Sequence, residues 1–296
     1  MARIHVTGGE GFLGRYVVRE LERAHGVVAS ERPGVDVTDL DSLLAAFEAD
    51  RPAVVVHLAA LCGAQPSVEN PQEFYRVNAW GTVQTLEACR RLGIERFVFA
   101  SSMTVFGSCD GAPVTESSPF APRHPYAAAK VSAEAAVAIY ARVYGLAAIV
   151  LRPTLVVGEG YKEPHAVGDF VTRASRGEVI ELYGGGRHVR DFAHPEDVAR
   201  AFSLAVDRIL TLPRGTHETF NISNGEPISM ADLADLVVRL AGRGEKRVVS
   251  PTAQTFSLYT SIEAARRTLR FTPRVTLASI IERLLAQTAA RRQETP

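Results

Sequence analysis

The chain has 296 residues, of which 46% are hydrophobic and 22% are charged. These are ordinary globular proportions, and they exclude a disordered or collagen-like protein. Basic and acidic residues number 33 each, so no overall charge would attract nucleic acid or an acidic membrane surface, and we expect neither as a partner.

The first two hundred residues alternate short β-branched runs with longer amphipathic segments. This pattern predicts strands at residues 3–7, 27–30, 53–58, 96–100 and 148–152. It predicts helices at residues 12–23, 42–49, 71–92 and 126–144, with Gly93 and Gly145 as helix stops. Strands that alternate with helices are typical of a parallel sheet covered on both faces. We therefore predict an α/β fold of the Rossmann type, with a doubly wound parallel sheet.

Beyond residue 152 the pattern becomes irregular. Further helices are predicted at residues 167–176, 194–210, 230–241 and 277–290, and one more strand at 219–222. We predict a nucleotide-binding domain at residues 1–157, whose sheet is completed by residues 191–222. Residues 158–190 and 223–296 would form a smaller C-terminal lobe that binds the substrate.

The sequence also indicates a compartment. No apolar run reaches the roughly 18 residues that a membrane span needs, and the strand pattern that begins at residue 3 leaves no room for a signal peptide. Cys62, Cys89 and Cys109 lack the spacing of a metal site and fit a reducing environment. We expect a cytoplasmic protein without a metal ion.

A glycine-rich segment, TGGEGFLG at residues 7–14, follows the first predicted strand and opens the first helix. Glycines allow a tight turn there and let a pyrophosphate approach the bare backbone, while the helix N-terminus offers free N–H groups. This context on both sides of the motif predicts a dinucleotide-binding site.

Glu31 ends the second predicted strand, where an acidic side chain accepts hydrogen bonds from the adenosine ribose. Its carboxylate would repel the 2′-phosphate of NADP, which favours NAD. Arg32 next to it could instead pair with that phosphate, so NADP stays open as a second choice. The alternative without a cofactor is a solvated Glu–Arg pair at a strand end.

A second group of polar residues follows the fourth predicted strand. Ser102 lies at its carboxyl end, which in a parallel sheet faces the ligand crevice, and Tyr126 and Lys130 lie one helical turn apart further on. Because phenol ionises at about pH 10, a neighbouring ammonium and a nicotinamide ring would be needed to lower the pKa of Tyr126. Tyr126 could then exchange a proton with an alcohol during hydride transfer. The alternative is a surface Tyr–Lys pair on an alanine-rich helix.

Together these motifs resemble the extended short-chain dehydrogenases/reductases, of the NAD-dependent epimerase/dehydratase type, along essentially the whole chain. Residues 7–14 resemble the family's TGGxGFxG, residues 57–60 its HLAA, and residues 101–107 its SSxxVYG, with phenylalanine in place of tyrosine. The spacing of serine, proline, asparagine and Gly-Thr over residues 67–82 is typical of members that act on nucleotide sugars.

The resemblance implies a role for individual residues. Ser102 would be the catalytic serine, Tyr126 the acid/base and Lys130 its partner. The cofactor would contact Gly8, Gly11, Phe12, Leu13, Glu31, Arg32, Asp36, Val37, Leu58, Ala59, Ala60, Asn78, Tyr126, Lys130 and Pro153. The substrate would contact Ser67, Ser102, Thr104, Tyr126 and Arg190, and the arginine would bind a substrate phosphate.

The chain also departs from the family pattern. Leu155 stands where members usually carry asparagine. One of two arginines expected to bind the diphosphate of a nucleotide sugar is absent from residues 250–261. Arg187, His188 or Arg247 could replace it, so the presence of a diphosphate in the substrate stays open.

From these observations we predict an NAD-dependent, sugar-modifying oxidoreductase/epimerase, in particular a nucleotide-sugar 4-epimerase that acts through a keto intermediate. Met103 and Thr104 stand where a dehydratase carries an acidic pair and argue against dehydration. The alternative is an NAD(P)-dependent dehydrogenase or ketoreductase for a smaller alcohol or ketone. A third hypothesis, a non-catalytic NAD-binding protein, is disfavoured by the complete Ser-Tyr-Lys set. We further expect a homodimer, and a structural role for His57 and Cys62.

Overall fold

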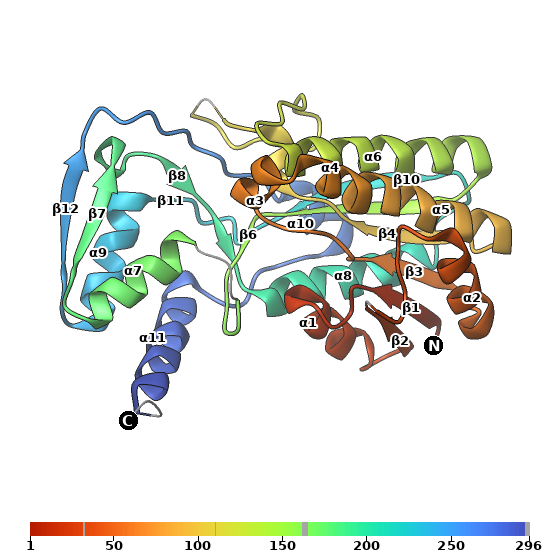
Figure 1. Ribbon diagram of the computed structural model, residues 1–296, viewed down its shortest axis with the longest axis horizontal. Coiled ribbons are helices and arrows are strands. Elements are labelled where there is room, and N and C mark those ends of the chain that lie inside the picture. Colours follow the sequence, from red (N-terminus) through yellow and green to blue (C-terminus); the bar gives the residue numbers. More distant parts are fainter. Residues whose placement is uncertain (32, 110, 162–164, 294–296) are drawn as a thin grey trace.

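The structure, a computed structural model, describes residues 1–31, 33–109, 111–161 and 165–293. Its centre is a sheet of six parallel strands in the spatial order β2-β1-β3-β4-β5-β10 (Figure 1). The strands are β1 (Arg3–Thr7), β2 (Gly26–Ser30), β3 (Val54–His57), β4 (Arg96–Ala100), β5 (Ala147–Pro153) and β10 (His217–Ile222). The predicted doubly wound α/β fold is confirmed.

Helices cover both faces of this sheet. One face carries α1 (Phe12–Leu21), α8 (Pro195–Ile209) and α10 (Glu263–Leu269); the other carries α2 (Leu40–Asp50), α5 (Gly81–Leu92) and α6 (Pro125–Tyr144). A hydrophobic core lies between the sheet and the helices on each face. Within β3, Val54 and Val56 belong to the core on the α1 and α8 face, and Val55 belongs to the core on the α2, α5 and α6 face. The continuous apolar run of this strand therefore reflects burial on both sides.

The helix predicted at residues 71–92 is helical throughout but irregular in its middle. After α3 (Ala64–Glu69), the chain forms α4 (Pro71–Phe74), a π-helical stretch η1 (Tyr75–Trp80), and then α5. Within η1, the Asn78 side chain accepts from the Leu61 amide at 2.8 Å and donates to the Leu61 carbonyl at 2.9 Å. The extra residue in this turn thus presents an amide to the chain that follows β3, a use typical of π-bulges.

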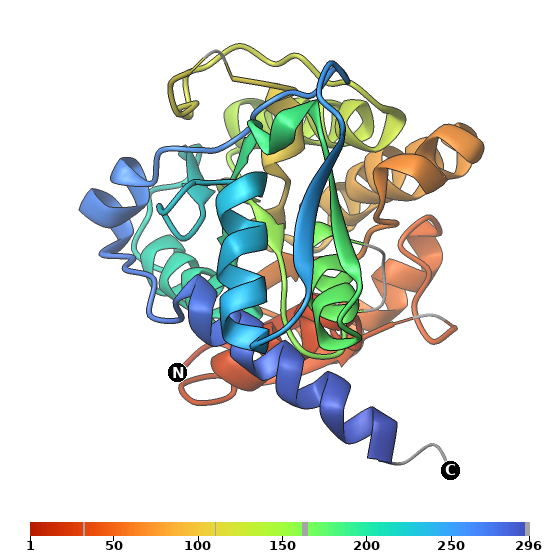
Figure 2. The same cartoon turned by 90° about the vertical axis from the view of Figure 1, so that its left-hand side faces the viewer.

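The second half of the molecule is built from short strands and three helices. Two-stranded pairs form between β6 (Leu155–Val156) and β9 (Phe192–Ala193), between β7 (Val179–Tyr183) and β12 (Glu245–Ser250), and between β8 (Val189–Arg190) and β11 (Ile228–Ser229). Helices α7 (Ala166–Ser175), α9 (Met230–Ala241) and α11 (Leu277–Gln293) share a third core with β7 (Figure 2). Short 3-10 turns, η2 (Met103–Phe106) and η3 (Gly184–Gly186), complete the list. No helix within the described ranges has the length and apolar character of a membrane span.

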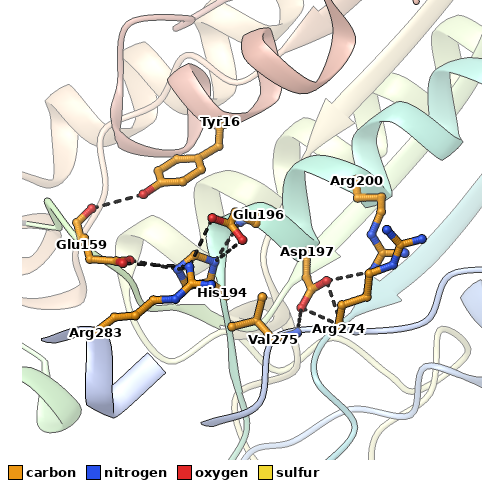
Figure 3. Close-up of polar contacts among 9 residues, drawn as sticks. All are labelled: Tyr16, Glu159, His194, Glu196, Asp197, Arg200, Arg274, Val275 and Arg283. Atoms are coloured by element: carbon orange, nitrogen blue, oxygen red, sulfur yellow. Dashed lines mark hydrogen bonds and ion pairs between the residues drawn. The ribbon is translucent and has the colours of Figure 1, made fainter. Parts of the chain in front are cut away.

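A buried aspartate attaches this second half to the sheet. Asp197 on α8 is 3% exposed and accepts the backbone N–H groups of Arg274 at 3.0 Å and Val275 at 2.9 Å (Figure 3). It also accepts from the Arg200 guanidinium at 2.7 Å. These bonds fix the segment that leads into α11.

His194, at the N-terminus of α8, is a second junction (Figure 3). Its Nδ1 accepts from the Glu196 amide, so Nε2 carries the proton and donates to the Glu159 carboxylate at 3.0 Å. Tyr16 on α1 donates to the Glu159 carbonyl at 3.4 Å, and Arg283 on α11 pairs with Glu196 at 3.2 Å. The loop after β6, helices α1 and α8 of one sheet face and the last helix therefore meet at this histidine.

Replacing Asp197 by alanine should lower the free energy of unfolding by about 3–5 kcal/mol, because a charged guanidinium and two buried N–H groups lose their acceptor. Chemical denaturation measures this value. Asp169→Ala, which removes an exposed i,i+4 pair with Arg173, should cost only about 0.3–0.5 kcal/mol. Equal losses for the two variants would show that Asp197 does not hold the two halves together.

Candidate active site

The glycine-rich turn between β1 and α1 leaves no room for a side chain at Gly8 or Gly14. Gly8 has φ +73°, and a Cβ there would lie 2.6 Å from the Ala59 backbone nitrogen. A Cβ on Gly14 would lie 2.1 Å from the Gly8 carbonyl oxygen. Helix α1 begins at Phe12, after Gly11, and receives no side-chain cap. Its first N–H groups therefore face the turn without a side-chain acceptor, as an anion-binding helix N-terminus requires.

A pocket lies beside this turn, at the carboxyl ends of β1, β2 and β3. Its lining brings together five of the residues expected to contact a cofactor, and others: Gly8, Ser30, Glu31, Val35, Val37, Ala59, Ala60, Leu61 and Val77. Glu31 Oε2 is buried and has no hydrogen-bond partner within the described part of the chain. A buried acceptor without a donor is costly, so this oxygen fits a ribose hydroxyl as its missing partner.

The other expected cofactor residues do not line this pocket. Phe12 and Leu13 begin α1, Leu58 directly follows β3, and Pro153 ends β5. Asp36 accepts from both the amide and the hydroxyl of Thr38 at 2.8 Å and so also stabilises its own turn. Asn78 positions Leu61 of the pocket wall through the two bonds given above. Arg32 lies outside the described residues.

His57, at the end of β3, is fully enclosed. Its Nδ1 lies 2.7 Å from the Thr7 hydroxyl and its Nε2 lies 3.2 Å from the Thr82 hydroxyl. Because Thr82 donates its own proton to the Asn78 carbonyl, it must accept from Nε2–H, which defines a neutral tautomer. Burial, and secondly the Lys130 charge, lower the pKa of His57 to about 3. The imidazole thus links β1, β3 and α5 through two side-chain hydroxyls.

Ser102 and Tyr126 meet above the end of β4. Ser102 accepts from the Thr104 amide at 3.2 Å and from the Thr104 hydroxyl at 3.0 Å. Its own proton is therefore free to be donated, and donation toward the Tyr126 oxygen acts to lower the pKa of that phenol. The Tyr126 ring is held by two aromatic side chains that sequence reasoning missed: His124 stacks on it at 5.9 Å between centroids, and Phe74 contacts it edge-on at 6.3 Å.

Lys130 lies behind this pair and is 2% exposed. Its Nζ donates to the Ala100 carbonyl at 2.7 Å and lies 6.0 Å from the centre of the Tyr126 ring. Burial lowers the pKa of Lys130 to about 8. The expected lowering of the Tyr126 pKa is not observed in the chain itself, because burial raises that pKa and the Ser102 hydrogen bond only partly opposes the shift.

A buried ion pair beneath the catalytic residues is the main feature that sequence reasoning missed. Arg152 of β5 and Glu134 of α6 are each 4% exposed, with Nη2 and Oε2 2.6 Å apart. Glu134 also accepts from the Ser101 hydroxyl, and Arg152 Nη1 donates to the Glu116 carbonyl at 3.1 Å. The adjoining ends of β4 and β5 are thereby fixed to the helix that carries Tyr126 and Lys130.

The expected substrate residues differ in their surroundings. Ser67 is buried and donates to the Ala64 carbonyl at 2.6 Å within α3. Thr104 bonds to Ser102, whereas Arg190 of β8 is half-buried and donates to the Val189 carbonyl at 3.0 Å. Leu155, at the position where asparagine is usual, is 38% exposed. Within the described residues, no group of histidine, cysteine and acidic side chains could hold a metal ion.

With this geometry established, comparison with known proteins defines the class. The chain matches the NAD dependent epimerase/dehydratase family over residues 4–223, and it belongs to that family. A putative UDP-glucose 4-epimerase of Methanocaldococcus jannaschii is 30% identical, over 95% of this chain and 97% of its own length. The UDP-glucose 4-epimerase of Corynebacterium glutamicum is also 30% identical, over 97% and 96%.

Two solved structures agree with these relatives. The UDP-glucose 4-epimerase of Thermotoga maritima, crystallised with UDP-glucose, superposes with a TM-score of 0.85 and is 28% identical, over 98% of this chain and 99% of its own. The UDP-glucose 4-epimerase of Brucella ovis, in complex with NAD, gives a TM-score of 0.87 at 27% identity, over 97% and 98%.

The neutral state of His57 predicts how stability changes with pH. The unfolded chain binds a proton on this residue below its ordinary pKa of about 6.5, whereas the folded protein does so only near 3. Between these values stability falls with falling pH by about 1.4 kcal/mol per pH unit from this group. The free energy of unfolding is measured by denaturation at several pH values. Between pH 6 and 4.5 it should fall less steeply with falling pH for His57→Gln than for the wild type, by about 1.4 kcal/mol per pH unit. Identical slopes for both proteins would contradict the assignment.

Proposed function

We propose that the protein is an NAD-dependent nucleotide-sugar 4-epimerase. The observation that carries this proposal is the junction of α6 with the carboxyl end of β4. Ser102 follows β4, Tyr126 lies in the first turn of α6, and Lys130 is buried with its Nζ on the Ala100 carbonyl. The same sheet edge holds the glycine turn and the pocket with the unpartnered Glu31 oxygen. Relatives named UDP-glucose 4-epimerase, matched along nearly their whole length, support this reading.

The pocket chemistry supports NAD as the cofactor. Glu31 offers a carboxylate where a 2′-phosphate would be repelled, and the glycine turn offers backbone N–H groups to a pyrophosphate. When bound there, NAD supplies a hydride acceptor and donor, and a positive ring whose charge favours the Tyr126 phenolate. The tyrosine thus receives from its surroundings the stabilisation that Lys130 alone does not provide.

The residues of the chain handle the proton. Tyr126 removes the proton of the sugar hydroxyl as the hydride leaves the same carbon, and a ketone forms. Ser102 donates a hydrogen bond to the reacting oxygen, since its own lone pairs already accept from Thr104. After the keto sugar turns over, hydride returns to the opposite face and Tyr126 gives the proton back. The net result is inversion at one carbon, with no oxidant consumed.

The proposal also assigns cofactor binding and substrate binding to different parts of the chain. Residues 1–157, with the sheet completed by residues 191–222, would bind the cofactor. Residues 158–190 and 223–296 would bind the sugar nucleotide. The third core, formed by α7, α9, α11 and β7, supports treating most of this lobe as a packing unit of its own. A cytoplasmic location, and the absence of nucleic-acid and membrane partners, stay predictions from the sequence.

We also propose a homodimer formed through the helices on the α6 side of the sheet. Elements η1 and α6 contact each other. Five of their large apolar side chains are between 42% and 59% exposed: Tyr75, Trp80, Ile139, Val143 and Tyr144. Apolar side chains gathered on neighbouring helices favour association with a second copy.

Light scattering should therefore give twice the chain mass for the wild type. Trp80→Glu combined with Val143→Glu should give the single-chain mass, because two charges would be buried in the interface. Val248→Glu, on exposed β12, should stay dimeric. A monomeric wild type would refute the dimer and leave the enzymatic proposal unaffected.

The first experiment is to denature the purified protein and identify the released dinucleotide. An epimerase returns its hydride within one turnover, so we expect bound NAD and interconversion of UDP-glucose and UDP-galactose without added cofactor. Tyr126→Phe should lower kcat by about 10²- to 10⁴-fold with an unchanged NAD content. Tyr140→Phe, on the same helix and bonded to Glu87, is the matched control and should retain activity.

Three outcomes would contradict the proposal. Full activity of Tyr126→Phe would refute the assigned acid/base. An empty protein that oxidises small alcohols with added NAD or NADP would favour the dehydrogenase alternative. Released NADP would refute the role of Glu31 in choosing the cofactor.

A further inference from the structure

Two arginines from distant segments share one aromatic ring. The guanidinium carbon of Arg123 lies 4.5 Å from the centre of the Phe256 ring, and that of Arg190 lies 4.7 Å from the same centre. The two cationic groups are therefore separated by at most the sum of these distances. Cation–π contacts with the ring hold both groups in place.

The backbone of three segments converges to form this arrangement. Residues 251–262 cross from β12 to α10 beside the loop that precedes α6 (Figures 1 and 2). Isolated bridges join Ser257 to Cys109 of that loop and Leu258 to Arg190 of β8. Phe256 therefore lies between the loop and β8, and it is 40% exposed.

Neither arginine is neutralised by a carboxylate among the described residues. Arg190 donates to the Val189 and Phe256 carbonyls only, and Arg123 forms no ion pair there, whereas Arg152, Arg173 and Arg208 all pair with acids. His188 beside them supplies no negative charge, and burial and the Arg190 charge lower its pKa, which favours its neutral form. Two like charges held close together are unfavourable unless an anion lies between or beside them.

The arginine pair also lies next to the catalytic residues along the chain. Arg123 immediately precedes His124, which caps α6 and stacks on Tyr126. The stem of Arg123 lies against Gly107, where a Cβ would be 3.2 Å from its Cγ, and Gly107 ends the turn that Ser102 begins. An anion bound by this pair would thus belong to a molecule that reaches Tyr126.

We propose that Arg123 is a further diphosphate-binding residue, held by Phe256 beside Arg190, whose contact with a substrate phosphate the family resemblance already implies. This inference rests on the proposed function. It adds that the chain recognises the diphosphate of the substrate by charge. Two guanidinium groups match the two phosphates, because each can donate paired hydrogen bonds to one phosphate. Arg187, which donates to the Pro251 carbonyl at 3.4 Å, and Arg247, exposed on β12, do not share the ring.

The test compares the affinities of UDP and uridine for the NAD-loaded protein by calorimetry. Arg123→Gln should weaken UDP binding by about 10- to 100-fold, the loss expected for a charge-assisted contact with a phosphate. It should leave uridine binding unchanged, because uridine carries no phosphate. Phe256→Leu should weaken UDP binding by a smaller factor, and Arg239→Gln, an exposed arginine of α9, should change neither.

The outcomes separate this inference from the proposed function. Wild-type affinity of Arg123→Gln for UDP would overturn the subsite, even if UDP-sugar epimerisation is observed. An equal loss of uridine and UDP affinity would also overturn it, since the residue would then act through the fold. A selective loss of UDP affinity in a protein that does not epimerise UDP-sugars would support the subsite and refute the epimerase.

Discussion

The buried pair of Glu134 and Arg152 is the interaction on which the catalytic geometry depends. Removing one partner from such a pair costs about 3–5 kcal/mol, because the other charge is left buried without compensation. Glu134 also accepts from Ser101, and Lys130, one turn earlier on α6, donates to the Ala100 carbonyl. Helix α6 therefore grips two consecutive residues at the end of β4, directly before Ser102. These backbone and side-chain contacts of α6 with Ala100 and Ser101 set the position of Ser102 relative to Tyr126.

The burial that gives this rigidity also disfavours charge at the centre. It raises the pKa of Tyr126, lowers that of Lys130 and keeps His57 neutral. A phenol in such surroundings retains its proton until a positive charge is placed beside it. Proton transfer by Tyr126 is thereby linked to occupation of the neighbouring pocket. While the pocket is empty, the phenol stays protonated.

The sheet was predictable because its signals are local. The run Val54–Val56 is buried on both faces, and helices end at Gly93 and Gly145, which both adopt left-handed conformations. Strand β12 was missed because five of its six residues are exposed, so that no apolar alternation marks it. The π-turn at Asn78, the Glu134–Arg152 pair and the contact of Arg123 with Phe256 were missed for another reason. Each depends on residues brought together by the tertiary fold, which no spacing in the sequence expresses.

The segment 251–262 has a consequence for how such a protein can change. It meets the loop before α6 through two isolated backbone bridges and strand β8 through one, all outside the central sheet. Substitutions there alter the surroundings of Arg123 and Arg190, while the sheet edge with Ser102 and Lys130 keeps its own supports. Recognition and chemistry are thus mechanically separable, and a lineage can exchange one ligand for another without rebuilding its catalytic machinery.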